Sequence, residues 1–345
     1  MSTRKDVAER AGVSQAVVSY VINNSNYVSD EKRAAVLEAI RELNYHPNFV
    51  AKSLRQKKTN HFVVLAKDLR NEMSINLIYY IEKAAYNAGY FTSVTSIDTP
   101  QKASNYLSSL MGRSYDGILL ISNIYSEDQI NKLAESGFPI VLYQYRFYSN
   151  LSPDVSIFMP QMFEASEKAV NYLIEKHRHR IIGYLTDGDP ASINEGGPWG
   201  QGFRANGYIN ALKSHNIPIP EDWIYFLETQ SKFKDIQSGI ESVIGHFKSS
   251  PCNQRPTAFF CGTDSIAAML IFELQNNGFS VPNDVEVIGF GNTYSSTICN
   301  PLITTVDINY KQAADTILNM LIRKSSGENV SHQSLPLKFI RRYSA

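Results

Sequence analysis

The sequence has few cysteines and no long apolar run. Its 345 residues include only three cysteines, Cys252, Cys261 and Cys299, and no two of them form a C-x-x-C pair. This excludes a disulfide framework and a cysteine-based zinc site, and it favours a reducing compartment. Apolar runs such as residues 118–121 are too short to cross a bilayer, and the start MSTRKDVAERAG lacks the apolar core of a signal peptide. We therefore expect a soluble cytoplasmic protein without a membrane partner.

Recognisable catalytic groups are also missing. The seven histidines are scattered, no G-x-S-x-G motif occurs, and the loop GGPWGQG at 196–202 lacks the G-K-[ST] of a phosphate-binding loop. From these absences we expect no enzymatic activity, no cofactor and no metal site.

The chain has no net charge, since 33 Lys and Arg stand against 33 Asp and Glu. This excludes a wholly polybasic protein, but the charges are unevenly spread. Residues 1–58 hold ten basic and six acidic side chains, a net charge of +4, and the rest of the chain carries −4. A basic end on an acidic body indicates a separate anion-binding module.

Three helices are predicted in the basic end. Thr3 (with Asp6), Ser14 and Ser29 each stand where a capping residue would begin a helix, and Gly12 ends the first one. Apolar residues at three- and four-residue spacing predict one buried face for each of the next two helices: Val17, Val18, Val21 and Ile22, then Val36, Ala39, Ile40 and Leu43. Two short helices joined by a tight glycine turn predict a helix-turn-helix.

The outward face of the second helix is uncharged and consists of Gln15, Ala16, Ser19, Tyr20 and Asn23. Such side chains suit base edges in a major groove, while phosphates would be attracted by Arg4, Lys5, Lys32 and Arg33. The alternative is a small helical cap with a polar surface, and the charge asymmetry favours DNA binding. A short helix is also predicted after Pro47, and at about two turns it would be marginal alone in water.

From residue 62 onward, short apolar runs alternate with amphipathic segments. Strands are predicted at 62–66, 92–95, 117–122, 140–143, 181–185, 258–261 and 285–290, and helices at 75–88, 162–175, 202–214, 235–247 and 265–277. This alternation predicts parallel sheets with helices on both faces. The length accommodates two such α/β subdomains facing each other across a cleft.

A family resemblance runs along the whole chain. The N-terminal part reads DVAERAGVSQAVVSYVINN and then YVSDEKRAAVLEAIRELNYHPNFVAKSL, and the body contains DGILLIS, FRANGYINAL, PTAFFCGTDSIAAMLIFELQNNGFSVPNDVEVIGFGN and NPLITTVDI. In order and spacing these segments resemble the lactose-repressor (LacI/GalR) family of bacterial transcription regulators. The resemblance implies an all-α helix-turn-helix headpiece at 1–46, a hinge helix and linker at 47–59, and at 60–345 an α/β effector-binding and dimerisation domain similar to periplasmic binding proteins. The implied N-subdomain takes 60–160 and 293–324, and the C-subdomain takes 161–292 and 325–345.

DNA contacts follow from the resemblance residue by residue. Ser14 and Ser19 match phosphate-contacting positions, Gln15 and Ala16 match base-reading ones, and Leu54 matches a wedge into the central base step. The complete implied set is Thr3, Ser14, Gln15, Ala16, Ser19, Tyr20, Asn23, Ser29, Asn48, Ala51, Lys52 and Leu54. Relatives usually have Arg where this chain has Tyr20, so its target sequence should differ. Tyr20 either faces bases and phosphates or packs on the headpiece surface.

A ligand site in the cleft, near the carboxyl ends of the strands, is also implied. Arg204 would donate to ligand oxygens, or else is a surface helix arginine, and Trp199 would stack on a sugar ring or wall the cleft. The complete implied set is Met73, Ser74, Ser122, Gln144, Tyr145, Arg146, Trp199, Arg204, Phe233, Thr263, Asp264, Gly291 and Asn292. We expect a sugar-like or anionic metabolite as ligand. Carboxylates common in relatives, which accept from sugar hydroxyls, are absent at Gln144 and at Gly291–Asn292, so the ligand should be either less hydroxyl-rich or anionic, the latter with Arg146 and Arg204 as partners.

The sequence therefore predicts a homodimeric transcription regulator, a repressor of a palindromic operator, whose DNA affinity is changed allosterically by a sugar or sugar derivative. Because the chain ends at FIRRYSA without heptads, a dimer is expected rather than a coiled-coil tetramer. The alternative is a solute-binding or sensor protein of the periplasmic-binding type, which would share the cleft but lack the basic headpiece. An enzyme on the same scaffold is disfavoured by the missing catalytic groups.

Overall fold

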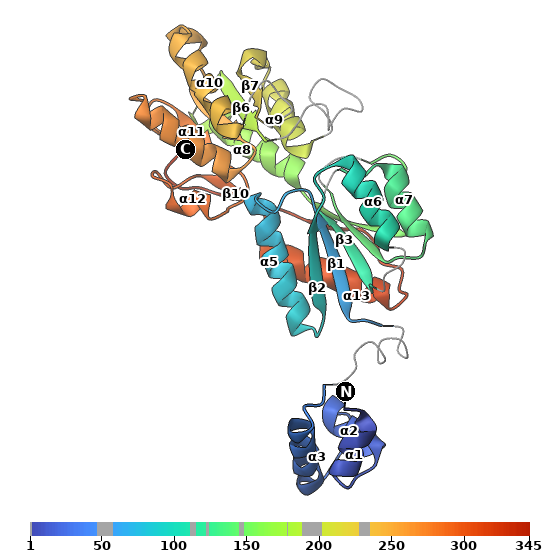
Figure 1. Ribbon diagram of the computed structural model, residues 1–345. Coiled ribbons are helices and arrows are strands. Elements are labelled where there is room, and N and C mark those ends of the chain that lie inside the picture. The colour runs from blue at the N-terminus through green and yellow to red at the C-terminus, as the bar shows by residue number, and fades with distance from the viewer. Residues whose placement is uncertain are drawn as a thin grey trace. The chain divides into compact units, whose positions relative to one another are not determined.

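Residues 2–46, 58–110, 115–121, 124–144, 148–177, 179–187, 202–227 and 235–345 are described by the computed structural model shown in Figure 1. The chain divides into two compact units, Met1–Thr59 and Asn60–Ala345. No helix of the described residues is both long enough and apolar enough to cross a membrane.

Three helices appear in the described part of the N-terminal unit: α1 (Arg4–Arg10), α2 (Gln15–Asn23) and α3 (Asp30–Glu42). Val7, Val18 and Val36, one from each helix, are fully buried in its core. The predicted apolar faces are confirmed at their centres, where Val21 and Ala39 are also buried. Their margins are only partly buried, at Val17, Ile22, Ile40 and Leu43.

Local hydrogen bonds fix where these helices begin. The Thr3 hydroxyl accepts from the Asp6 N–H, and the Asp6 carboxylate accepts from the Thr3 N–H, which confirms the predicted capping pair. The Ser14 hydroxyl likewise accepts from the Val17 N–H at 3.3 Å and caps α2. The turn between α1 and α2 needs a positive φ, which Gly12 supplies at 63°. Ser29 precedes α3 as predicted, but its side chain makes no capping hydrogen bond.

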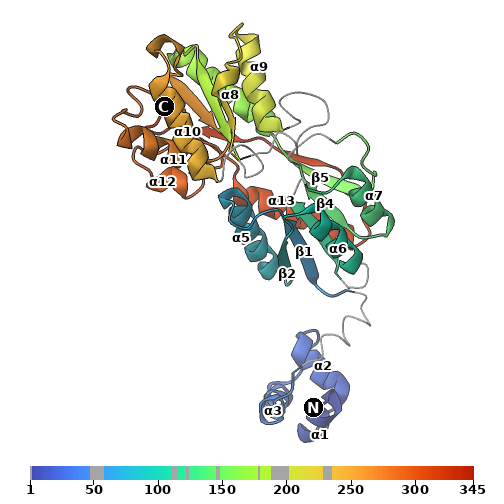
Figure 2. The same cartoon turned by 45° about the horizontal axis from the view of Figure 1, so that its top comes forward.

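The first sheet of the larger unit has the strand order β11-β5-β4-β3-β1-β2, and all pairings are parallel. The strands are β1 (His61–Ala66), β2 (Phe91–Ser96), β3 (Gly117–Ile121), β4 (Ile140–Tyr143), β5 (Val155–Pro160) and β11 (Gln333–Leu335). Alternate residues of β1 point to opposite faces of the sheet. On one face, Phe62 and Val64 belong to the same hydrophobic core as Leu77, and on the other face Val63 belongs to a second core with Ala103. The helices α5 (Glu72–Asn87) and α13 (Tyr310–Ser325) therefore cover one face, and α6 (Pro100–Leu110) and α7 (Glu127–Glu135) cover the other (Figures 1 and 2).

The second sheet has the order β7-β6-β8-β9, again with parallel pairings. Its strands are β6 (Ile182–Thr186), β7 (Ile224–Phe226), β8 (Ala258–Cys261) and β9 (Glu286–Ile288). One face packs on α8 (Met162–His177) and α9 (Phe203–Ser214), and the other on α10 (Ile236–Ser249) and α11 (Asp264–Asn276). Shorter elements are η2 (Glu221–Trp223), η3 (Cys252–Gln254) and α12 (Ser295–Ile298).

The chain passes between the two sheets three times. It leaves the first sheet from β5 into α8, returns from β10 (Thr305–Asp307) into α13, and leaves again from β11 into β12 (Lys338–Ile340). The second and third crossings are antiparallel to each other, because β10 pairs with β12. At the first crossing, just after β5, the Gln161 N–H donates to the Leu335 carbonyl oxygen at the end of β11.

The predicted strands and helices of the body are all present, and the α/β architecture with two parallel sheets is confirmed. The expected subdomain limits differ from the strand pairing in two places. Residues 295–298 form α12, which contacts α11 of the second subdomain, and β11 at 333–335 belongs to the first sheet. The second and third passages between the subdomains therefore lie about ten residues later in the chain than expected, because the chain crosses at β10 and between β11 and β12.

Candidate functional site

The outward face of α2 presents the uncharged side chains predicted to read DNA. Gln15, Ala16 and Asn23 are exposed, Tyr20 is 36% exposed, and Ser19 is half-buried. The core contacts of Val18 and Val21 explain this orientation, because they turn the opposite side of a short helix outward.

Ser14 and Ser19 keep a hydroxyl proton that their observed bonds do not use. The Ser14 hydroxyl accepts from the Val17 N–H, and the Ser19 hydroxyl accepts from the Asn23 side-chain amide at 3.2 Å. A serine that accepts one bond can still donate its own proton, for example to a phosphate oxygen. The hydroxyl of exposed Thr3 is in the same position, since it accepts from the Asp6 N–H.

Several basic side chains around α2 have internal partners. Lys5 lies 3.7 Å from Glu9, and Arg33 donates to the Asn24 side-chain oxygen at 3.2 Å, just after the end of α2. Exposed pairs of this kind are weak, so they do not withdraw these cations from a phosphate backbone. The predicted hinge residues lie outside the described residues: Asn48, Ala51, Lys52 and Leu54.

In the larger unit, Arg204 lies in the first turn of α9 and at the carboxyl ends of β6 and β8. Its Nη1 donates to the Gly262 carbonyl oxygen, and its Nη2 lies 3.9 Å from a carboxylate oxygen of Asp187. The guanidinium carbon is 5.6 Å from the centre of the Phe290 ring, and the side chain is 19% exposed. Arg204 is therefore a half-buried cation held in one place, and not a surface helix arginine.

Two residues that sequence reasoning missed join this group. Asp187 directly follows β6, and its Oδ2 accepts from the side-chain amide of Asn71 at 3.1 Å. Asn71 also caps α5, because its Oδ1 accepts from the Ser74 N–H. A carboxylate and an amide from different subdomains thus meet next to Arg204. The position of Asp187 after a buried strand was the signal available in the sequence.

The loop after β9, in the second subdomain, contacts α5 of the first subdomain. A Cβ added at Gly291 would lie 3.0 Å from Met73 Cγ, and the Met73 sulfur lies 3.8 Å from Arg204 Nη1. The Ser295 hydroxyl donates to a Glu72 carboxylate oxygen at 2.7 Å. Met73, Arg204 and Gly291 are therefore close together, while their contact with a ligand stays a prediction.

Other predicted ligand contacts have internal structural roles. Asp264 is fully buried; its Oδ2 accepts from the Thr293 N–H at 2.7 Å, and its Oδ1 accepts from the Thr305 hydroxyl. The Thr263 hydroxyl caps α11 by accepting from the Ile266 N–H, and the Asn292 side-chain oxygen accepts from Arg342 at 2.6 Å. The observed bonds of these three side chains are therefore to other groups of the protein.

Of the remaining predicted ligand residues, two lie within the described part of the chain. Ser74 and Gln144 are buried, the latter directly after β4, and the observed backbone bonds join Ser74 to Asn71 and Gln144 to Phe158. The others lie outside the described residues: Ser122, Tyr145, Arg146, Trp199 and Phe233.

Comparison with known proteins matches both units. Residues 3–48 match the family described as bacterial regulatory proteins, lacI family, and residues 170–345 match the periplasmic binding protein-like domain. The HTH-type transcriptional repressor PurR of Photorhabdus laumondii is 31% identical over 97% of this chain and 94% of its own length. Catabolite control protein A of Priestia megaterium is 34% identical over 87% of this chain and 86% of its own length.

The fold also matches a crystal structure of the Lac repressor dimer bound to operator and the anti-inducer ONPF. That match has a TM-score of 0.77 at 22% identity and covers 99% of this chain and 98% of the other. With an exposed, uncharged α2 face in one unit and two parallel-sheet subdomains in the other, this chain belongs to the lacI family of bacterial regulatory proteins.

Proposed function

We propose that the protein represses transcription by binding a palindromic operator as a homodimer, and that a small ligand in the cleft of the larger unit changes its DNA affinity. The α2 face carries this proposal most directly, because Gln15 and Ala16 are exposed at the start of a capped helix. In a helix-turn-helix, the first residues of the second helix reach base edges in the major groove. Action on operator DNA would place the protein in the bacterial cytoplasm and requires no catalysis.

A gel-shift experiment tests the proposed DNA binding. The full-length protein would be titrated onto fragments from upstream of its own gene and onto a scrambled fragment, at about 50 and 200 mM salt. We expect a sequence-selective shift that weakens by roughly a thousandfold or more at the higher salt, because each phosphate contact releases counterions from the DNA and this release is less favourable at higher salt. A shift without selectivity, or none at all, contradicts the proposal.

We expect Tyr20→Ala to lower operator selectivity by about tenfold or more, the effect of losing one good base contact. The tyrosine is 36% exposed on the α2 face, where it can reach DNA. The measurement is the ratio of affinities for the operator and for single-base variants of it. Tyr27→Ala is the matched control, since Tyr27 is 94% exposed but lies beyond α2. Full selectivity in Tyr20→Ala would mean that the ring only packs on the headpiece.

We infer that the ligand is a neutral molecule with several hydroxyls and not an anion. Arg204 lies 3.9 Å from the Asp187 carboxylate, so the cation is already partly neutralised. The carboxylate, the guanidinium and the Asn71 amide together offer acceptors and donors, which is the combination that sugar hydroxyls need. Calorimetry with glucose, ribose and glucose 6-phosphate separates the two classes. Binding of the phosphate ester alone would favour the anionic alternative.

Arg204→Met is expected to weaken binding of whichever of these sugars binds by about a hundredfold, because a charged hydrogen-bond donor is lost. Operator binding without ligand should stay within about twofold of the wild type, since Arg204 lies outside the N-terminal unit. The matched control is Arg323→Met, which removes an exposed arginine paired with Glu328 on α13. Unchanged sugar affinity in Arg204→Met would remove this residue from the ligand site.

A further inference from the structure

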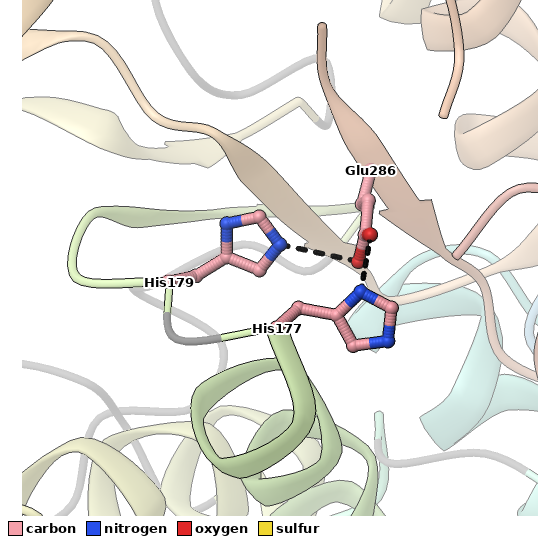
Figure 3. A group of neighbouring side chains, drawn as sticks. All are labelled: His177, His179 and Glu286. Carbon is pink, nitrogen blue, oxygen red and sulfur yellow. Dashed lines mark ion pairs between the residues drawn. The ribbon is translucent and has the colours of Figure 1, made fainter. Parts of the chain in front are cut away.

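We propose that His177, His179 and Glu286 form a binding site for a divalent transition-metal ion. His177 ends α8, His179 lies in the turn before β6, and Glu286 begins β9 (Figure 3). The sequence alone suggested no metal site, because Glu286 is far from the two histidines along the chain. The fold joins them at the amino ends of the strands, whereas Arg204 lies at the carboxyl ends, so this group is separate from the proposed ligand cleft.

The three side chains present their ligand atoms to one another. His177 Nδ1 lies 2.6 Å from Glu286 Oε1, His179 Nε2 lies 3.1 Å from Glu286 Oε2, and all the ligand atoms are within 4.8 Å (Figure 3). Bonds from zinc to histidine nitrogen or carboxylate oxygen are about 2.0–2.2 Å, so neighbouring ligand atoms of a tetrahedral site are about 3.4 Å apart. Small side-chain rotations are enough to place one ion among these atoms.

Outer partners hold each imidazole in the orientation that a metal requires. His177 directs Nδ1 at Glu286, and its Nε2 is 3.1 Å from the Tyr172 hydroxyl. His179 directs Nε2 at Glu286, and its Nδ1 is 2.6 Å from the Thr257 hydroxyl. A metal-binding histidine typically uses one nitrogen for the metal and hydrogen-bonds through the other, which fixes its tautomer. Both histidines have this arrangement.

Two buried atoms at the centre form an ion pair but no hydrogen bond. His179 Nε2 and Glu286 Oε2 are 3.1 Å apart, and among the described residues neither has a hydrogen-bond partner. Buried polar atoms without a hydrogen bond are rare and point to an ion or water between them. The His179 and Glu286 side chains are 12% and 13% exposed, while His177 is 32% exposed, which leaves one side open for a water molecule as fourth ligand.

Nitrogen and carboxylate ligands in this number suit zinc and its neighbours among the divalent metals, and not calcium or magnesium. A bound ion would tie the end of α8 to the start of β9, across the start of β8, which lies between β6 and β9 in the sheet. The role inferred for the metal is therefore to stabilise the second subdomain.

Calorimetric titration of the full-length protein with zinc chloride tests the site. We expect one zinc ion per chain and a melting temperature that rises by several degrees in excess zinc. His179→Ala and Glu286→Gln should each weaken zinc binding by about a hundredfold or more, and Thr257→Val by about tenfold through the outer partner. His215→Ala is the matched control and should leave zinc binding unchanged, because His215 forms a two-residue pair with Glu175 at 3.6 Å.

Three outcomes would overturn the proposal. The first is a wild-type protein that binds no zinc ion, which would make the group a plain ion pair. The second is unchanged zinc affinity in both His179→Ala and Glu286→Gln, with folding of the variants checked by circular dichroism in EDTA. The third is loss of zinc binding in Cys252→Ser, because it would assign the ion to this exposed thiol.

Discussion

The stability of an Asp264→Asn variant relative to the wild type is expected to rise by up to about 3 kcal/mol between pH 4 and pH 7. Burial raises the pKa of Asp264 from 3.8 to about 6, despite hydrogen bonds from Thr305 and Thr293 that favour the charged form. The folded state therefore holds this proton more tightly than the unfolded state. The resulting stability is fully present below pH 3.8 and is lost as the pH rises through about 6.

Asparagine imitates the protonated acid and cannot ionise. Its oxygen can accept from the Thr293 N–H, and its amide can donate to the Thr305 hydroxyl, so the loop after β9 keeps its partners. Asp264→Ala is expected to behave differently and to lose about 1–3 kcal/mol at pH 4, because the buried Thr293 N–H loses its acceptor.

Urea unfolding of the three proteins at several pH values measures both effects. Other carboxylates titrate in the same range, but they cancel when the variant is subtracted from the wild type. Asp315→Asn is the matched control for a surface acid, since Asp315 is 52% exposed and paired only with Lys311 among the contacts seen in the described residues. A difference between Asp264→Asn and the wild type that does not vary with pH would show that Asp264 titrates normally.

The starts of the first two helices in the N-terminal unit were predictable from residues close together in the sequence. Thr3 and Ser14 are confirmed as caps because a cap depends on residues three positions away. Ser29 occupies a cap position without the hydrogen bond, and nothing in the structure explains why. Five strands of the body, β1, β3, β4, β6 and β8, are short buried runs, and these were also readable from the sequence.

Long-range pairing was not readable from the sequence. The strand β11 at 333–335 contains one buried apolar residue, Leu335, and its place is set by pairing with β5 far earlier in the chain. The subdomain limits were misplaced for this reason. In the same way, Asp187 stands in a turn sequence, and only the fold brings it to Arg204 and Asn71.

A second large effect is expected at an exposed apolar face of the larger unit. On α5 and the edge strand β2, Tyr79 is 55% exposed, Tyr86 71% and Phe91 65%. The hydrogen bond between Ser295 and Glu72 brings α12 next to α5, and there Tyr294 and Ile298 are also exposed. Exposed apolar side chains gathered on neighbouring elements mark an interaction surface. We propose that the second copy of the chain binds here, as the predicted homodimer requires.

We expect Tyr79→Glu to convert the dimer into monomers and to weaken operator binding by roughly a hundredfold to ten-thousandfold. A two-fold interface contains each residue twice, so one substitution buries two unpaired carboxylates. Once the two headpieces are separate, the second half-site is no longer bound intramolecularly, and this accounts for the size of the loss. Sedimentation velocity gives the mass, and gel shifts give the affinity for a full operator and for a half-site.

The half-site measurement separates this explanation from a damaged headpiece, because a monomer with an intact headpiece keeps the half-site affinity of the wild type. Gln101→Glu is the matched control. It adds the same charge on α6, which covers the opposite face of the first sheet, so it should leave both mass and affinity unchanged. If Tyr79→Glu remains a dimer with full operator affinity, the two copies associate through another surface, and the exposed tyrosines of α5 need a different partner.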